Sequence, residues 1–250
     1  MMVHRSFFQW SQRTGSLVRT VQDDIAAGRL SWVSLKTPSW AAMAAGSHDN
    51  EIDELLRALK DLKVDVWLTM HHEPEGGGGV NSPDDPAGPA GHLAMNRQVR
   101  ERMTALNVTN VALAPVLMTW TWASGSGRNP NEWWDSGVYD FLGVDHYMSD
   151  DASLVTNRWY DVRAWAAARG VPVAVGEWGL LRSDSVGAAR VQEWFDHAAN
   201  SHRDGRGARV IGLAYFDSDN EYSGKVWALK GEALEKWKQL LHDPRNANPD

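Results

Sequence analysis

Hydrophobic and polar positions along the chain repeat with two periods, one typical of amphipathic helices and one of buried strands. Over residues 49–62, Ile52, Leu55 and Leu59 recur every three or four positions, which predicts a helix with one apolar face. Short apolar runs bounded by polar residues predict strands buried on both faces. These signals predict strands over 4–10, 30–35, 64–68, 111–118, 141–147, 171–177 and 210–217, and helices over 16–27, 49–62, 92–106, 154–169, 185–202 and 231–241.

Predicted strands and helices alternate with short connections, which is the pattern of parallel βαβ units. We therefore expect one α/β domain over residues 1–250, folded as a (β/α)8 barrel of the TIM type. An open doubly wound sheet that binds a nucleotide is disfavoured because no glycine-rich phosphate loop opens a predicted helix. A closed barrel needs eight strands and the pattern supplies one fewer, so the first strand is expected to be missing or truncated.

Composition narrows the classes of partner. A chain of 250 residues that is 43% hydrophobic can bury a full core, and we expect a monomer. The net charge of -7 and the lack of a basic run argue against nucleic acid and anionic membranes as partners. There is no cysteine, so disulfides and thiolate metal sites are excluded. No apolar run is long enough to span a bilayer. The N-terminus also lacks the apolar centre of a signal peptide, so we expect a cytoplasmic protein or a chain that starts after a removed segment.

The candidate chemistry lies where the predicted strands end. Residues 71–75 read His-His-Glu-Pro-Glu directly after a buried strand, and four glycines follow at 76–79. A second glutamate, Glu177, ends the strand over 171–177 and is flanked by glycines. In a parallel barrel all strand ends lie on one face, where such enzymes bind their substrates. We therefore expect Glu73 and Glu177 to face one cleft.

Two strand-end carboxylates predict glycoside hydrolysis, because one protonates the leaving oxygen while the other, ionised, attacks the anomeric carbon. Two alternatives stay open at this point. One is a catalytically silent barrel that binds carbohydrate. The other is a metal-dependent barrel hydrolase, in which His71, His72, Glu73, Asp145 and His146 hold zinc. Glu75 is expected to be solvated at the cleft rim, and Asp84-Asp85 to form a solvated turn.

The chain has 14 tryptophans against 5 phenylalanines and 5 tyrosines, and several of these indoles lie near predicted strand ends. Flat aromatic faces suit stacking on a sugar ring. Trp122 and Trp178 are the favoured stacking residues. Stacking and lining of the barrel rim remain equally open for the other candidates, which are Trp10, Trp40, Trp120, Trp133 and Trp134.

The segment Val66–Pro74 resembles the acid/base strand of the retaining (β/α)8 glycosidases, most closely glycoside hydrolase family 26, the β-mannanase family. Gly176-Glu177-Trp178-Gly179 resembles the nucleophile strand of that family. Segments 120–124, 133–135 and 139–147 resemble its fifth strand, the following loop and its sixth strand. The acid/base motif continues here with Pro74-Glu75, where the family usually has a form containing asparagine.

The resemblance implies a retaining, endo-acting enzyme that cleaves mannan or a related β-glycan without a cofactor. Glu73 corresponds to the general acid/base and Glu177 to the nucleophile, with His72 and Tyr147 as their respective partners. The resemblance also suggests a secreted protein, whereas the N-terminus of this chain shows no signal peptide. The other residues expected to bind or orient the polysaccharide or oligosaccharide are Trp10, Trp120, Trp122, Asp145, His146 and Trp178.

Overall fold

The computed structural model describes residues 2–76, 83–147, 152–222 and 224–246. Contacts within the chain define two compact units, Val3–Gly143 and Val144–Asp250, the latter together with Met1–Met2. The expectation of one catalytic domain stays a prediction. No helix in the described ranges combines the length and apolar character needed to cross a bilayer.

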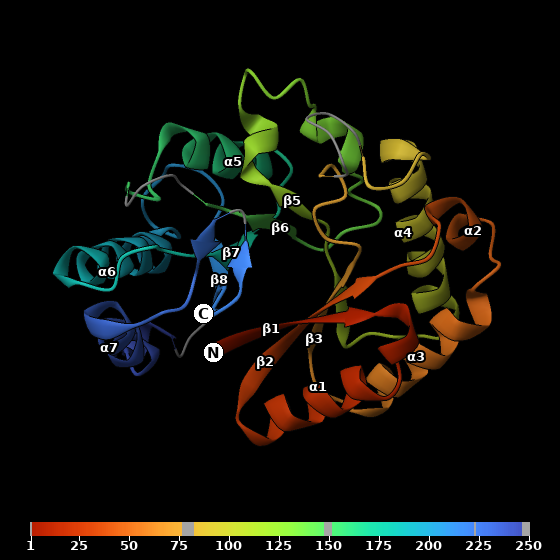
Figure 1. Cartoon of the computed structure of the whole chain (residues 1–250). Coiled ribbons are helices and arrows are strands. Elements are labelled where there is room, and N and C mark those ends of the chain that lie inside the picture. The colour runs from red at the N-terminus through yellow and green to blue at the C-terminus, as the bar shows by residue number, and fades with distance from the viewer. Residues whose placement is uncertain (1, 77–82, 148–151, 223, 247–250) are drawn as a thin grey trace. The chain divides into compact units, whose positions relative to one another are not determined.

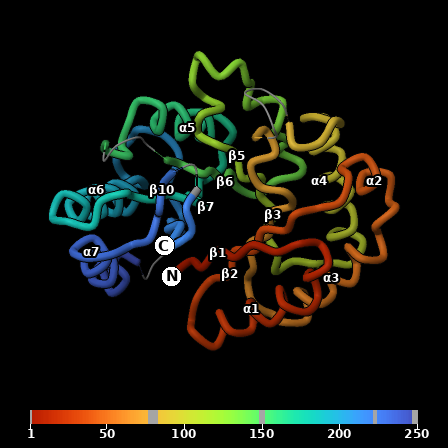
Figure 2. The backbone as a smooth tube through the Cα atoms, in the orientation of Figure 1, coloured from red at the N-terminus to blue at the C-terminus, as the bar shows by residue number. Residues whose placement is uncertain are grey.

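The unit Val3–Gly143 is built around parallel strands. Four strands lie side by side in chain order: β1 (Met2–Gln9), β2 (Arg29–Lys36), β3 (Val66–Met70) and β4 (Val111–Leu113). Pairing is parallel from β2 to β3 and from β3 to β4. The intervening helices, which Figures 1 and 2 show outside these strands, are α1 (Ser16–Ala26), α3 (Asp49–Asp61) and α4 (Gly88–Ala105). Consecutive strands of this unit are thus connected through helices, as the predicted βαβ pattern requires.

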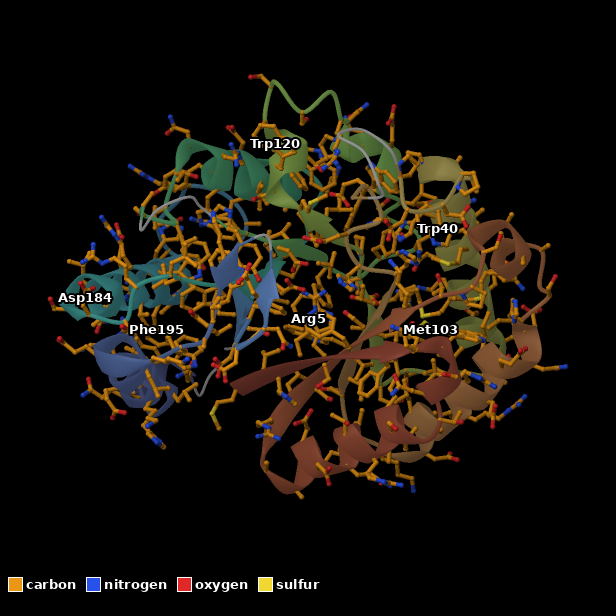
Figure 3. All side chains as sticks on the ribbon, viewed as in Figure 1. Arg5, Trp40, Met103, Trp120, Asp184 and Phe195 are labelled. Atoms are coloured by element: carbon orange, nitrogen blue, oxygen red, sulfur yellow. The ribbon has the colours of Figure 1, made fainter. Side chains whose placement is uncertain are left out.

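Large side chains fill the space between the strands of this unit. Trp32 is fully buried and its indole Nε1 donates to Oγ1 of Thr69 at 2.9 Å. Arg5, labelled in Figure 3, lies over the Trp32 ring at 5.1 Å and donates through Nε to the Ser34 hydroxyl at 3.2 Å. A Cβ on Gly143 would lie 2.6 Å from the Pro115 carbonyl oxygen, so only glycine fits there. The strands thus enclose a packed interior in this unit.

The single strand expected over 111–118 is two strands, which is a correction. Strand β4 ends at Leu113, and β5 (Val116–Met118) begins after Pro115. Proline has no N–H to donate to a neighbouring strand, and it interrupts the ladder here. The chain then enters a short 3₁₀ turn, η2 (Thr119–Trp122), instead of continuing as a strand.

The unit Val144–Asp250 continues the same alternation. Strands β7 (Val173–Trp178) and β8 (Val210–Tyr215) pair in parallel, and β6 (Leu142–Asp145) ends at the start of this unit. Figure 1 shows α6 and α7 beside β7 and β8. The helices of this unit are α5 (Asn157–Ala167), α6 (Ser185–Asn200) and α7 (Gly231–Leu241).

Most predicted elements are confirmed to within a few residues of their ends. Helix α4 begins at Gly88, earlier than the predicted residue 92, with a proline in its first turn, where the missing N–H costs nothing. The sequence did not predict the one-turn helix α2 (Trp40–Ala44), the 3₁₀ turn η3 (Pro130–Trp133) or the antiparallel hairpin of β9 (Glu221–Tyr222) and β10 (Lys225–Val226).

Candidate functional site

The strand that carries Glu73 ends in a strained turn. His71 and Glu73 have φ of 62° and 46°, in the left-handed region that non-glycine residues rarely adopt. Each such residue costs on the order of 1–3 kcal/mol and persists only where its surroundings impose it. The N–H of His71 donates to the Leu35 carbonyl at 2.9 Å, and that of Glu73 to the Val116 carbonyl at 2.8 Å. The neighbouring strands β2 and β5 therefore hold the turn in place.

The two histidines of this turn lie in different surroundings. His71 is 5% exposed, and its Nδ1 accepts from the Trp40 indole at 3.1 Å. An indole N–H only donates, so Nδ1 of His71 is unprotonated and Nε2 carries the hydrogen. That hydrogen is donated to the Asp84 carboxylate at 2.7 Å, and Lys36 forms an ion pair with the same oxygen of Asp84. Burial lowers the pKa of His71, which keeps the ring neutral.

The expectation that Asp84-Asp85 is a solvated turn is confirmed only in part, because Asp84 is exposed but both carboxylates are hydrogen-bonded. Asp84 bonds His71 and Lys36, and Asp85 accepts from the backbone N–H of Trp40 at 3.1 Å and of Ala87 at 2.8 Å. Asp84 therefore connects the segment before α4 to the ends of β2 and β3, and Asp85 connects it to the start of α2. Part of the predicted glycine loop, residues 77–82, lies outside the described residues.

His72, the predicted partner of Glu73, is half-buried and meets the Phe7 ring edge-on at 5.1 Å. Burial, together with the positive charge of Arg5, lowers its pKa to about 3, so the imidazole is neutral at physiological pH. Within the described residues its Nδ1 has no hydrogen-bond partner. Glu73 is also half-buried, and its contact with His72 stays a prediction.

The expectation that Glu75 is solvated at the cleft rim was wrong. Glu75 is 2% exposed, and Oε1 accepts from the Met118 N–H at 2.7 Å and from the Thr121 hydroxyl at 2.8 Å. Its Oε2 is buried and finds no partner among the described residues. Burial raises the pKa of this carboxyl to about 7. A buried carboxyl two residues from Glu73 is the feature that sequence reasoning missed. No signal in the neighbouring sequence could have found it, because its partners Met118 and Thr121 are distant along the chain.

The second candidate glutamate is held at the end of β7. Glu177 is half-buried, and its Oε2 accepts a hydrogen bond from the Tyr147 hydroxyl at 3.0 Å. Its backbone carbonyl accepts from the N–H of His146 at 2.8 Å. The Tyr147 ring packs on Trp227 at 4.7 Å, and a Cβ on Gly179 would lie 2.9 Å from Trp227. The predicted pairing of Tyr147 with Glu177 is therefore present, in a tightly packed setting.

Two residues of this unit that were expected to bind or orient the sugar, Trp178 and His146, are buried, which argues against direct contact and leaves an orienting role a prediction. Trp178 is fully buried against Trp194 and Tyr215, at ring distances of 6.4 and 4.8 Å. His146 is also fully buried, and its Nε2 bonds the Leu154 carbonyl at 2.8 Å. Burial lowers the pKa of His146 to about 4. Side chains alternate faces along a strand, so the neighbours of Tyr147 and Glu177 point into the core instead.

The remaining predicted site residues differ in exposure. Asp145 is 2% exposed, which leaves it an orienting role at most. Trp120 is 42% exposed, and Trp122 and Trp10 are half-buried, so stacking on sugar stays a prediction for these three. Two further indoles, Trp40 and Trp133, are core residues that pack together at 6.4 Å.

No three histidine, aspartate or glutamate side chains in the described ranges are grouped as a metal site requires. Glu73 belongs to the unit Val3–Gly143 and Glu177 to the unit Val144–Asp250. Glu73 follows the carboxyl end of β3, and Glu177 lies at the carboxyl end of β7.

Comparisons with known proteins agree with the fold expected from the sequence. No family model matches the chain, and no curated sequence matches it. Solved structures do match. One is a family 26 β-mannanase from Bacteroides ovatus, with a TM-score of 0.64 at 14% identity, over 99% of this chain and 82% of that one. Another is the catalytic domain of a family 26 endo-β-1,4-mannanase from Bacillus sp. JAMB-750, with a TM-score of 0.63 at 15% identity, over 94% and 71%.

A third match is a β-mannanase from a symbiotic protist of the termite Reticulitermes speratus, solved with a gluco-manno-oligosaccharide. Its TM-score is 0.60 at 12% identity, over 96% of this chain and 77% of that one. At such identities the likeness establishes the fold. The fold class is the α/β (β/α)8 barrel of the TIM type, and the resemblance to glycoside hydrolase family 26 is confirmed at this level.

Proposed function

We propose that the protein is a retaining glycoside hydrolase that cleaves internal bonds of mannan or a related β-linked polysaccharide. The observation that carries this proposal is the strand-end Glu177 bonded to the Tyr147 hydroxyl at 3.0 Å, in a fold shared with β-mannanases. Glu73 lies in the turn that follows another parallel strand, β3, of the same fold. Strand ends are where TIM-type enzymes carry their catalytic groups.

The chemistry follows from two carboxyl groups with different tasks. Glu177, ionised, attacks the anomeric carbon while Glu73 donates its proton to the departing oxygen, and a covalent glycosyl-enzyme forms. Glu73 then takes a proton from the incoming water, which attacks from the face that the first leaving group left, breaks the bond to Glu177 and so restores the original configuration. Tyr147 donates to Glu177 and so fixes the direction of the attacking oxygen. Retention requires the two carboxyl groups to lie about 5–5.5 Å apart when substrate binds.

The experiment is a substrate panel with a stereochemical readout. Wild type is incubated with mannan, xylan, β-glucan and chitin-type oligomers, and NMR identifies the anomer that forms first. We expect β-linked mannan or glucomannan to be cleaved internally with the β-anomer first. Glu177→Ala should be inactive on the same substrate, and azide should restore turnover of an aryl glycoside as the α-glycosyl azide, because azide then attacks from the vacated side.

A first-formed α-anomer would exclude the double displacement. Sugar binding by wild type with turnover no better than that of Glu177→Ala would instead identify a carbohydrate-binding barrel without activity. Loss of activity with a chelator, restored by zinc, would favour a metal-dependent hydrolase. Circular dichroism of each variant shows whether a lost activity reflects lost folding.

A further inference from the structure

Glu75 is tied to a segment far from it in the sequence. Its Oε1 accepts the Met118 N–H at 2.7 Å and the Thr121 hydroxyl at 2.8 Å, so one carboxyl oxygen joins the end of β3 to the segment after β5. Both Glu75 and Thr121 are buried, with 2% and 1% exposure. Water therefore does not compete for these two hydrogen bonds, and each contributes more than it would at the surface.

The segment held by Glu75 is the 3₁₀ turn η2, Thr119–Trp122. A single 3₁₀ turn has few hydrogen bonds of its own and depends on external support. Trp120 lies directly before Thr121, is 42% exposed and is labelled in Figure 3. The Thr121 hydroxyl bond thus fixes the backbone from which this exposed indole projects.

The same two segments are joined by further contacts at Glu73 itself. The Glu73 N–H donates to the Val116 carbonyl at 2.8 Å, and the Gly76 N–H returns to the Glu73 carbonyl at 2.9 Å. A Cβ on Gly76 would lie 3.0 Å from the Met118 methyl carbon, so the Met118 side chain packs against this turn. A shift of η2 is therefore transmitted to Glu73, and a shift of Glu73 to η2.

We propose that Glu75 is a positioning residue that holds the Trp120 turn in a defined place relative to Glu73. The indole of Trp120 would then stack on a sugar ring of a β-linked oligosaccharide, one bound next to the bond that Glu73 protonates. This inference rests on the proposed function and adds to it a specific sugar-binding element. It concerns only residues of the unit Val3–Gly143.

The protonation behaviour of Glu75 is consistent with this role. Burial raises the pKa of its carboxyl to about 7. Oε1 accepts both hydrogen bonds whether or not Oε2 carries a proton. Glutamine has the same shape as the protonated acid and keeps an acceptor oxygen, whereas alanine removes the connection altogether. The two substitutions therefore separate the connection from the charge.

The test measures local order and sugar affinity without requiring turnover. Glu75→Ala and Thr121→Val are each made in a Glu177→Gln background, with Glu101→Ala, on the outer face of α4, as the matched control. Hydrogen exchange by mass spectrometry follows peptides covering 118–123. Calorimetry with mannohexaose gives Kd. We expect faster exchange in this segment and a Kd raised about five- to tenfold in both variants, with most of the loss restored by Glu75→Gln and by Thr121→Ser.

Other results would overturn the positioning role. These are unchanged exchange over 118–123, raised exchange with an unchanged Kd, or a Glu75→Gln variant as impaired as Glu75→Ala. Absence of affinity for mannohexaose and for every other oligosaccharide of the panel would also overturn it. Failure of the proposed function is a separate result, namely a wild type that binds sugar and hydrolyses none. Should Glu75→Ala not fold, Thr121→Val decides the question alone.

Discussion

The carboxyl ends of β3 and β7 each present a glutamate, and they are built differently. At β7 the chain stays extended through Glu177, and one phenol donor bonds the carboxylate at 3.0 Å. At β3 the chain leaves the strand through His71 and Glu73, which both have positive φ, and backbone bonds to neighbouring strands hold the turn. A phenol donor thus holds the side chain of Glu177, and backbone bonds hold the turn that carries Glu73.

This difference matches the two tasks in the proposed mechanism. A nucleophile stays ionised and must point in one direction, which a fixed hydroxyl donor provides. A general acid/base must gain and lose its proton in each cycle, so its carboxyl group has to be placed accurately in both protonation states. At the β3 end the backbone of Glu73 is placed by its N–H bond to the Val116 carbonyl at 2.8 Å. Experiments on each strand end test whether the contrast is functional.

The largest expected effect is on the rate of cleavage, and it distinguishes the two glutamates by their dependence on the leaving group of the substrate. Glu73→Gln should slow cleavage of an oligosaccharide by about 10²–10⁴-fold, the usual contribution of acid catalysis. It should slow formation of the glycosyl-enzyme from a dinitrophenyl glycoside far less, because that leaving group departs without a proton. Glu177→Gln should abolish both reactions. Burst-phase kinetics on the two substrates provide the measurement, and equal losses for Glu73→Gln on both substrates would remove the acid role.

The next effect is the pH dependence of stability at the β3 end. Burial raises the pKa of Glu75 from 4.5 to about 7, so the folded protein binds this proton more tightly than the unfolded chain. Its contribution to stability is therefore complete below pH 4.5, declines as the pH rises and is lost above pH 7. The gap between these pKa values corresponds to at most about 3 kcal/mol.

Glu75→Gln cannot ionise, so its free energy of unfolding should lack this decline. Urea denaturation of wild type and Glu75→Gln at several pH values from 4.5 to 8 measures the difference, in which the contributions of all other titrating groups cancel. Parallel curves for the two proteins would show that Glu75 titrates normally, and would contradict the burial observed in the structure.

At the β7 end, Tyr147→Phe should lower kcat by about 10–100-fold with little change in KM. The lost bond joins a hydroxyl to a charged acceptor, an interaction that contributes about 1.5–3 kcal/mol. Tyr160→Phe, on helix α5, is the matched control and should keep full activity. A Tyr147→Phe enzyme as active as wild type would mean that packing alone orients Glu177.

The smallest effect concerns the connection from Asp84 to His71. Asp84→Asn keeps an acceptor for the His71 Nε2–H and removes the ion pair with Lys36, so we expect a loss of about 1 kcal/mol in the free energy of unfolding. Asp65→Asn, an exposed substitution just before β3, is the control. Urea denaturation at pH 7 compares the two. A loss equal to that of the control would show that the backbone bonds alone hold the turn.

The sequence predicts the order of strands and helices and places both glutamates at strand ends. It can do so because hydrophobic periodicity and the residues that end helices and strands are local properties of the chain. The helix over 49–62 is one example, since its apolar stripe produced α3 (Asp49–Asp61). The split at Pro115 was also open to prediction, because proline cannot donate a ladder bond. Strand alternation could likewise have assigned Trp178 and His146 to the core once Glu177 and Tyr147 were placed on the other face.

Only the tertiary structure decided the surroundings of the acidic residues. Nothing near Glu75 in the sequence indicates that Met118 and Thr121 enclose it, because burial depends on segments that are distant along the chain. The same holds for Asp84, which is exposed as expected but also bonds His71, a partner that the neighbouring sequence does not indicate. The sequence by itself determined which residues can perform acid, base and nucleophilic chemistry. Packing between distant segments determined which of them are buried, which are bonded and how their protons are held.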